Sequence, residues 1–528
     1  MAEGVGWGWE GAPGGDSREQ FLAQSKIFSS RLHPLATSRR NACQTQKMET
    51  RKQPISMRAH NCAAKVFRSV APLLLIASLL VLYARPKNKS EANQTTAAAV
   101  FDDPLALVLT PQKSDSRIDG EISRLQQQIR SGRNVQLWLE QLGWAFVTKA
   151  RESFDPGFYK LAEECARCIE KRNPQSEEAM LLRAHVLQNL HRFKESETPA
   201  RRLVQQRGLS FDYGLLGDAL MEQGKLKDAV EAYQRMMNLK PDLHAYARAA
   251  HMRWLKGDLA GAIEAMQLAV GAASPLNAES AAWVNTRLAF YEFQAGQFQE
   301  AEQRCAFAFA FQNNYPPALL LQGKMLLARN RFREAVDALQ NAAKQNPLPE
   351  YQWTLAEALR AVGRENEASG IETQLRQRGA IADPRTLTLF LATRHESPET
   401  ALRLAQAELN SRSDVFTHDA LAWSLAAAGK LGEAYDQMQR ALAEGTEDGR
   451  LFFHAAVIAS KTGHAADADR WLRKANELSH LLLPSERNQL HNAATSDAKQ
   501  QASLAPNQKK TFPLGRNTAR KAQPQPKT

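Results

Sequence analysis

Residues 416–446, FTHDALAWSLAAAGKLGEAYDQMQRALAEGT, contain one complete unit of a repeating pattern. Within it, Leu421 and Leu425 have the spacing of one apolar face of a helix. Gly429 interrupts that face, and Ala434 lies on a second one. The stretch therefore predicts two helices joined by a tight turn.

Ala434 belongs to a series of small residues that recur at intervals of 33 to 39 residues. These small-residue positions are Ala162, Ser196, Ala229, Ala262, Ala301, Ala335, Ala368, Ala401, Ala434 and Ala468. Two helices that cross closely need a small side chain at their contact. A period of this length predicts a stack of similar helix pairs rather than a single globular core.

Two further residue types recur with the same period. A glycine, which favours a positive φ in a helix–helix turn, stands five residues before the small-residue position in six units: Gly224, Gly257, Gly296, Gly363, Gly429 and Gly463. In the eighth unit, Glu396 stands at that position. A proline, which cannot continue a helix, stands twelve residues after the small-residue position in three units: Pro174, Pro241 and Pro347.

These features resemble the tetratricopeptide repeat. The residues that match its pattern are Leu142, Gly143, Leu216, Gly217, Ala229, Tyr233 and Pro241. Ten units fit between about Leu137 and about His480, and the chain looks similar to bacterial proteins with many such repeats and no assigned activity. The resemblance implies an all-α fold, an α-solenoid of about ten helix–turn–helix repeats.

The pattern divides the chain into six segments. We expect a low-complexity, disordered extension (1–64), a signal peptide or single membrane anchor (65–84), a linker (85–116), an N-terminal capping helix (117–136), the solenoid (137–484) and a basic, disordered tail (485–528). The capping helix is predicted from apolar residues at helical spacing, namely Ile118, Ile122, Leu125 and Ile129.

The residues from Ser69 to Ala84 form an apolar run without a charge. The run is shorter than the roughly 20 residues that span a bilayer, and it suits the hydrophobic region of a signal peptide. A translation start at Met57, rather than at Met1 or Met48, would place a basic segment directly before it. We therefore expect export to the periplasm or extracellular space, or anchoring with the solenoid outside. A buried helix and a cytoplasmic protein are the alternatives.

The net charge of +12 is concentrated at the two ends of the chain. Residues 1–89 carry +9 and residues 499–528 carry +7, so residues 90–498 carry −4. A solenoid that binds phosphates on its own surface should be basic there. Nucleic acid is therefore an unlikely partner on this composition, and the basic ends are the place where it would bind.

Residues that could carry chemistry are few. Cys165 and Cys168 have the spacing of a metal or redox pair, but no second such pair exists, and their place within a helix favours simple packing. The twelve histidines form no HExxH motif, and no phosphate-binding or nucleophile motif occurs. We expect no enzyme activity, no cofactor and no metal site.

In the tetratricopeptide family, certain positions of the first helix face the concave groove. Transferred to this chain, the resemblance implies a groove for peptide or helix segments of protein partners, with Trp254, Trp283, Phe290, Phe293, Trp353, Arg360, Phe416, Trp423 and Phe453 as candidate contacts. The alternative is that these aromatic residues pack between repeats. The expected function is a non-enzymatic interaction scaffold. The competing hypotheses are a substrate-recruiting subunit of an enzyme complex and a binder of nucleic acid or anionic surfaces through basic tails.

Overall fold

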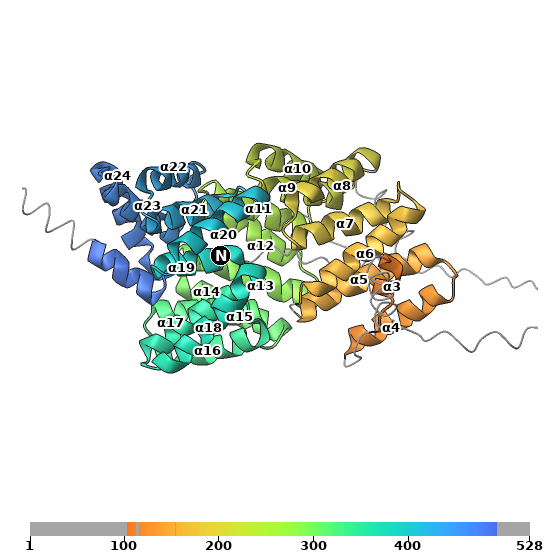
Figure 1. The fold of residues 1–528 in the computed structure, drawn as a ribbon, viewed down its shortest axis with the longest axis horizontal. Helices are drawn as coiled ribbons and strands as arrows, with labels where there is room; N and C mark the ends of the chain where they lie inside the picture. Colours follow the sequence, from red (N-terminus) through yellow and green to blue (C-terminus); the bar gives the residue numbers. More distant parts are fainter. Residues whose placement is uncertain (1–102, 112–115, 154, 494–528) are drawn as a thin grey trace, which may run out of the picture. The chain divides into compact units, whose positions relative to one another are not determined.

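The computed structural model describes residues 103–111, 116–153 and 155–493 (Figure 1). The expected N-terminal extension (1–64) and apolar segment (65–84) lie outside these residues. Within the described part of the chain, all regular secondary structure is helical. None of the helices in this part combines the length and the apolar character that a membrane crossing requires.

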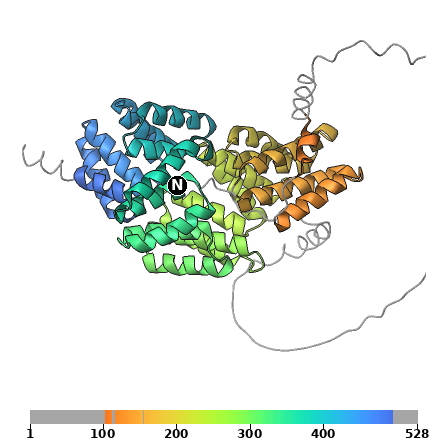
Figure 2. The ribbon, with the colours of Figure 1, turned by 60° about the horizontal axis from the view of Figure 1, so that its bottom comes forward.

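Twenty helices in the described residues, α5 to α24, form ten consecutive pairs that correspond to the ten predicted repeats (Figure 2). The first or A helices are α5 (Val135–Ser153), α7 (Glu177–Asn189), α9 (Ser210–Glu222), α11 (Leu243–Leu255), α13 (Ala278–Gln294), α15 (Pro316–Ala328), α17 (Pro349–Ala361), α19 (Pro384–Thr393), α21 (Val415–Ala427) and α23 (Gly449–Lys461). The second or B helices are α6 (Gly157–Arg172), α8 (Phe193–Gln206), α10 (Leu226–Leu239), α12 (Leu259–Gly271), α14 (Phe298–Phe311), α16 (Phe332–Gln345), α18 (Glu365–Ala382), α20 (Pro398–Ser411), α22 (Leu431–Leu442) and α24 (Ala465–Glu477). This α-solenoid confirms the predicted fold.

The small-residue positions lie where the two helices of a pair cross. All ten are buried, and Ala335 and Ala434 have no exposed surface. Ser196 shows the closeness of the contact directly, because its Oγ donates a hydrogen bond of 2.8 Å to the carbonyl oxygen of Ala184 on the partner helix. A larger side chain at these positions would separate the helices.

The turns within the pairs have the predicted conformation. The six turn glycines have φ between 73° and 79°. In the eighth unit, where Glu396 was expected to occupy the turn position, His395 has the positive φ of 54°, and Ser397 follows with 44°. This turn is one residue longer before α20 begins at Pro398. Histidine adopts positive φ more readily than most residues with a side chain, which accounts for the shift away from Glu396.

Two helices precede the repeats. Helix α4 (Arg117–Arg130) packs against α5 and buries the apolar residues that predicted it: Ile118, Ile122, Leu125 and Ile129. The side chain of Ser116 accepts a hydrogen bond from the main chain of Asp119 and so caps the start of α4. Helix α3 (Pro104–Val108) lies in the segment expected to be a linker.

The helical region continues beyond the expected end of the solenoid. After the short helix η1 (Ser479–Leu481), residues 484–493 are helical. This differs from the disordered tail expected from residue 485. The segment is polar in composition, but two of its residues are buried against the repeats. Leu490 is buried, and the fully buried carboxylate of Glu486 pairs with Arg450 at 2.7 Å.

The array also contacts itself between repeats that lie five apart. We call this contact the seam. Three hydrogen bonds join the last turn of an A helix to a residue that follows a B helix five repeats later: Ser413 N to Glu222 O (2.9 Å), Thr446 Oγ1 to Leu255 O (2.6 Å) and His480 Nε2 to Phe293 O (2.9 Å). Carbonyl groups in the last turn of a helix lack partners within that helix. The seam supplies donors for them.

Charged side chains continue the seam. The guanidinium of Arg412 donates to Glu222 at 2.5 and 2.9 Å, and both side chains are buried. Farther along, Arg487 in the helix 484–493 donates to the carbonyl oxygen of Leu327 at 2.8 Å, at the end of α15. The main-chain acceptors of the seam are thus Glu222, Leu255, Phe293 and Leu327, which lie in the last turns of the A helices of repeats three, four, five and six in order.

Candidate functional site

A cavity of about 120 Å³ lies on the side of the array formed by the A helices. Its lining comes from repeats three to ten and from the segment after α24. It has room for several water molecules or for part of a larger ligand. The seam brings the later repeats against the earlier ones, and so brings lining residues such as Arg412 and Phe416 to the same cavity as Glu222 and Trp254.

One wall of the cavity is an aromatic cluster. The ring of Trp254 on α11 stands edge-on to Phe290 on α13, with ring centres 5.3 Å apart. On another side, Phe416 of α21 stacks on Trp254 with centres 5.5 Å apart and an angle of 24°. Phe293 also lines the cavity. Aromatic side chains offer large apolar contact areas with defined geometry, which suits the anchoring of a partner's side chain.

The remaining wall carries balanced charge. Its five cationic residues are Arg287, Lys324, Arg385, Arg412 and Arg450, and its five acidic residues are Glu222, Glu350, Asp414, Asp419 and Asp448. Among them, Arg385 contacts Asp414 at 3.0 Å, and Lys324 pairs with Glu350. Equal numbers of the two signs provide no net attraction for a polyanion.

The buried carboxyl of Asp414 illustrates how these pairs act. Burial alone would raise the pKa of Asp414, but the guanidinium groups of Arg385 and Arg412 outweigh it and hold the pKa well below its usual range. The main-chain N–H of Thr417 donates to the same carboxylate at 2.7 Å, which caps the start of α21. Asp414 is therefore a charged, fixed acceptor at the edge of the seam.

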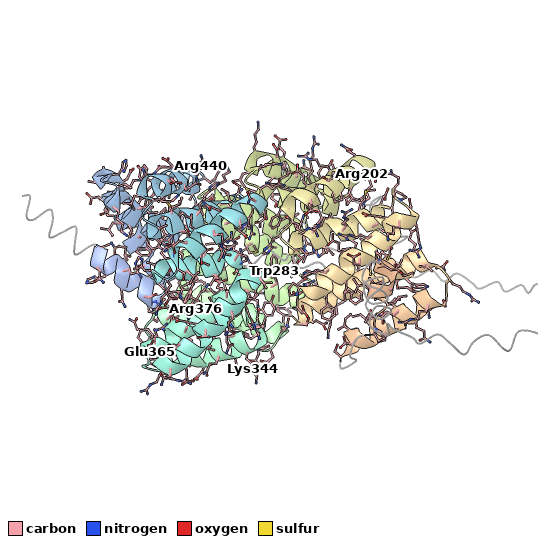
Figure 3. The ribbon with its side chains drawn as sticks, viewed as in Figure 1. Arg202, Trp283, Lys344, Glu365, Arg376 and Arg440 are labelled. Atoms are coloured by element: carbon pink, nitrogen blue, oxygen red, sulfur yellow. The ribbon has the colours of Figure 1, made fainter. Side chains whose placement is uncertain are left out.

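Four of the nine predicted groove residues line the cavity: Trp254, Phe290, Phe293 and Phe416. Of the other five, Trp283 on α13 is half-buried against the hydrophobic core (Figure 3). Trp353 packs edge-on against Phe390 at 5.8 Å, and Trp423 packs beside the fully buried Phe453 at 5.5 Å. The structure thus brings together the residues of repeats four, five and nine, and it places the others outside the cavity lining.

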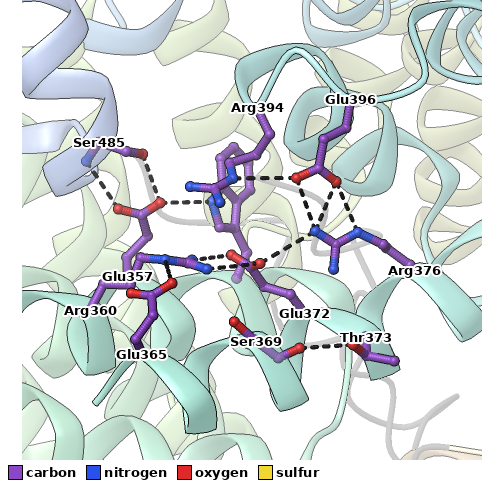
Figure 4. Close-up of polar contacts among 11 residues, drawn as sticks. Glu357, Arg360, Glu365, Ser369, Glu372, Thr373, Arg376, Arg394, Glu396 and Ser485 are labelled. Carbon is purple, nitrogen blue, oxygen red and sulfur yellow. Dashed lines mark hydrogen bonds and ion pairs between the residues drawn. The ribbon is translucent and has the colours of Figure 1, made fainter. Parts of the chain in front are cut away.

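The fifth of these residues, Arg360, belongs to a charged network on α17 and α18 (Figure 4). Arg360 pairs with Glu372 and, at 2.9 Å, with Glu365. Arg376 connects Glu372 at 3.3 Å to Glu396 at 2.8 Å. This network ties α17 and α18 to the turn before α20.

Several lining residues were not predicted, because they lie at helix ends and in connections. They are Glu222, Gln294, Arg412, Asp448, Leu481 and Leu483. A sequence signal for the seam does exist. Twelve residues after the small-residue position, where three earlier units have proline, the last three units have Ser413, Thr446 and His480. Each of them donates a hydrogen bond across the seam, and a proline has no main-chain N–H or polar side chain with which to do so.

The two cysteines with metal-like spacing lie within α6. Cys165 and Cys168 are both buried, and burial raises the pKa of the Cys165 thiol well above its usual range. A thiol held in its protonated form is a poor metal ligand and a poor nucleophile. Within the described residues, no group of three or more histidine, cysteine or acidic side chains could hold a metal ion.

Comparison with known proteins adds a family match. The model of the tetratricopeptide repeat matches residues 213–243, which contain α10 and most of α9. No curated protein matches the chain.

Similar solved structures include a chain of the APC/C hetero-tetramer Cut9–Hcn1, with 15% identity and a TM-score of 0.37 over 72% of this chain and 64% of that one. Yeast Tom70 has 12% identity and a TM-score of 0.31 over 79% and 96% of the two chains. The human IFIT1 dimer with PPP-AAAA has 13% identity and a TM-score of 0.35 over 68% and 78%. The chain thus spans less than two thirds of the Cut9–Hcn1 chain.

Arrays of helix pairs of this kind present extended binding surfaces and serve as protein-interaction scaffolds. The repeat spacing, the ten helix pairs and the family match agree with one another. The chain carries a tetratricopeptide repeat at residues 213–243, and the ten helix pairs of its described residues form an α-solenoid of similar units.

Proposed function

We propose that this scaffold binds an extended segment of a partner protein in the cavity lined by Trp254, Phe290 and Phe416. The observation that carries the proposal is the aromatic cluster, which combines three rings from repeats four, five and nine at one wall. The opposite signs of the lining charges balance, so they suit a neutral main chain better than a phosphate backbone. A cavity of about 120 Å³ suits a narrow extended segment better than a whole helix.

We also propose that the protein acts outside the cytoplasm, exported or tethered to a membrane, without catalysing a reaction itself. The apolar run Ser69–Ala84 between basic residues supports this location. Cell fractionation combined with N-terminal sequencing of the mature chain tests it. A cytoplasmic chain that retains residues 65–84 would contradict the proposal.

The binding proposal is tested by site-specific photo-crosslinking in cells. A benzoylphenylalanine placed at Phe416 should capture a discrete protein partner. The matched control is the same group at Phe307, which is 43% exposed on the B helix α14 and outside the cavity lining. Equal capture at both positions, or none at Phe416, would contradict binding in the cavity.

A second measurement separates the competing functions. Replacing Trp254 and Phe290 together with alanine, in a variant shown to be folded, should abolish capture of the partner. Retained binding that moderate salt abolishes would favour nucleic acid or an anionic surface bound by the basic ends, because phosphate contacts depend steeply on salt. A catalytic protein among the captured partners would identify a substrate-recruiting subunit.

A further inference from the structure

Two polar atoms of opposite kind lie buried and unpaired at the cavity. Among the residues that the structure describes, the indole Nε1–H of Trp254 has no acceptor, and the side-chain oxygen Oε1 of Gln294 has no donor. Both side chains are 1% exposed, and both line the cavity. Folded proteins pair nearly all their buried polar atoms, so an unpaired donor beside an unpaired acceptor calls for an explanation.

Both residues neighbour Phe290. Trp254 packs edge-on against Phe290 of α13. Gln294 follows Phe290 by four residues on the same helix, and side chains with this spacing are neighbours about 5–6 Å apart on one helix face. The donor of Trp254 and the acceptor of Gln294 therefore belong to the same part of the cavity.

The orientation of the Gln294 amide is fixed by its surroundings. Its Nε2 faces Asp448 Oδ2 at 3.5 Å, while Asp448 Oδ1 accepts the main-chain N–H groups of Arg450 and Leu451 at the start of α23. Turning the amide over would set its oxygen against a carboxylate oxygen. The atom of Gln294 that lacks a partner is therefore the acceptor.

An unpaired donor and an unpaired acceptor that line the same cavity match the two main-chain groups of one residue of an extended peptide. In a β-type main chain, the N–H and the C=O of the same residue point to the same side, as they do where paired antiparallel strands exchange two hydrogen bonds. The C=O would accept from Trp254 Nε1, and the N–H would donate to Gln294 Oε1. The residue's side chain would then lie near the aromatic cluster.

We propose that Trp254 and Gln294 form a main-chain binding site for one extended residue of the bound segment. The inference rests on the proposed function, because it takes the occupant of the cavity to be a protein segment. It adds the chemistry of recognition: a pair of hydrogen bonds to the peptide main chain, independent of the side chain that the residue carries.

The test uses two small probes and the full-length protein. N-acetylglycine N-methylamide contains one residue with both groups, whereas N-acetylsarcosine N-methylamide has a methyl group in place of the N–H that Gln294 would accept. The indole N–H resonance of Trp254, assigned through Trp254→Phe, should shift on addition of the glycine probe. The sarcosine probe should bind about three- to tenfold more weakly, the effect of losing one hydrogen bond.

Matched tryptophan variants separate recognition from stability. Trp254→Phe should weaken the glycine probe about three- to tenfold, followed through the Gln294 side-chain amide resonance. It should lower the thermal midpoint less than the control variant does, because both variants lose indole volume but only the control also loses a hydrogen bond. The control is Trp423→Phe. Trp423 Nε1 donates to Thr393 Oγ1 at 3.0 Å outside the cavity lining, so its loss should lower the midpoint and leave probe binding unchanged.

The inference is overturned if the Trp254 indole resonance does not respond to the glycine probe, or if the two probes bind equally. An indole resonance that shows exchange with water and no response to either probe would mean that ordered water alone pairs these atoms. If the probe binds as described but crosslinking at Phe416 captures no partner, the main-chain site stands and the scaffold function fails. If a partner is captured and the probe does not reach Trp254, the main-chain site alone fails.

Discussion

Gly257, in the turn between α11 and α12, lies directly against the main chain of Gly445. A β-carbon added to Gly257 would lie 2.5 Å from the carbonyl oxygen of Gly445. Gly257 also has a φ of 79°, a conformation that residues with a side chain rarely adopt. One glycine therefore serves both the turn within its repeat and the seam with a repeat five units later.

Gly257→Ala should destabilise the protein more than Gly429→Ala. Both positions have a similar positive φ, which costs alanine about 1–2 kcal/mol. Only Gly257 adds the close contact, since nothing lies within 4 Å of a β-carbon at Gly429. We expect a further loss of about 1–3 kcal/mol, typical of overpacking, measured as the difference between the two urea unfolding curves. Coincident curves would show that the main chain around Gly445 moves away from the added methyl group without a loss in the free energy of unfolding.

A larger side chain at the small-residue positions, where the two helices of a pair cross, should also destabilise the protein. Ala335→Leu and Ala434→Leu should each cost roughly 1–3 kcal/mol, because both side chains are fully buried between the helices of a pair. Gln340→Leu and Gln439→Leu are controls on the exposed faces of the same B helices. Thermal midpoints should fall for the alanine variants alone. A similar fall in the controls would point to the added leucine rather than to the crossing.

Stability should decrease as the pH falls below about 6.5. Burial, reinforced by nearby arginines, lowers the pKa of His185 and of His251 to about 3. Between about pH 3 and 6.5 the unfolded chain binds protons at these positions and the folded chain does not, so each histidine contributes a loss of about 1.4 kcal/mol per pH unit. Chemical unfolding at several pH values measures the slope. His185→Gln should reduce it.

The helix at residues 484–493 should be required for full stability. A fragment of residues 103–493 should unfold at a higher temperature than a fragment of residues 103–480, because truncation removes the buried Leu490 and Glu486. It would also deprive the half-buried Arg450 guanidinium of the Glu486 carboxylate. Equal melting temperatures by circular dichroism would contradict a structural role for this helix.

The repeat fold follows from local features of the sequence. A small residue such as Ala335 is needed wherever two helices cross, and a glycine such as Gly363 wherever a turn has positive φ, so each unit carries the pattern on its own. The aromatic half of the cavity was predicted for a similar reason, since Trp254 and Phe290 stand at fixed positions of their A helices.

The seam and the polar half of the cavity could not be predicted in this way. The pairing of Arg412 with Glu222 depends on the small rotation between successive repeats, summed over five of them, and no single unit encodes that sum. Gln294 is an ordinary polar residue at the end of a helix until Asp448 from another repeat orients its amide. In the last three units, Ser413, Thr446 and His480 stand where three earlier units have proline. This difference becomes informative only once it is known that the seam joins repeats five units apart.

The seam gives the array a fixed length. In most solenoids each unit contacts only its neighbours, so evolution can add or remove a unit at little cost. Here the loss of one unit between Glu222 and Ser413 would bring the wrong loop to each helix end and take the Glu222 carboxylate away from the buried Arg412. Units gained or lost before repeat three would leave the seam contacts unchanged. The number of repeats between the two sides of the seam is therefore set by packing, in the same sense as the size of a buried side chain.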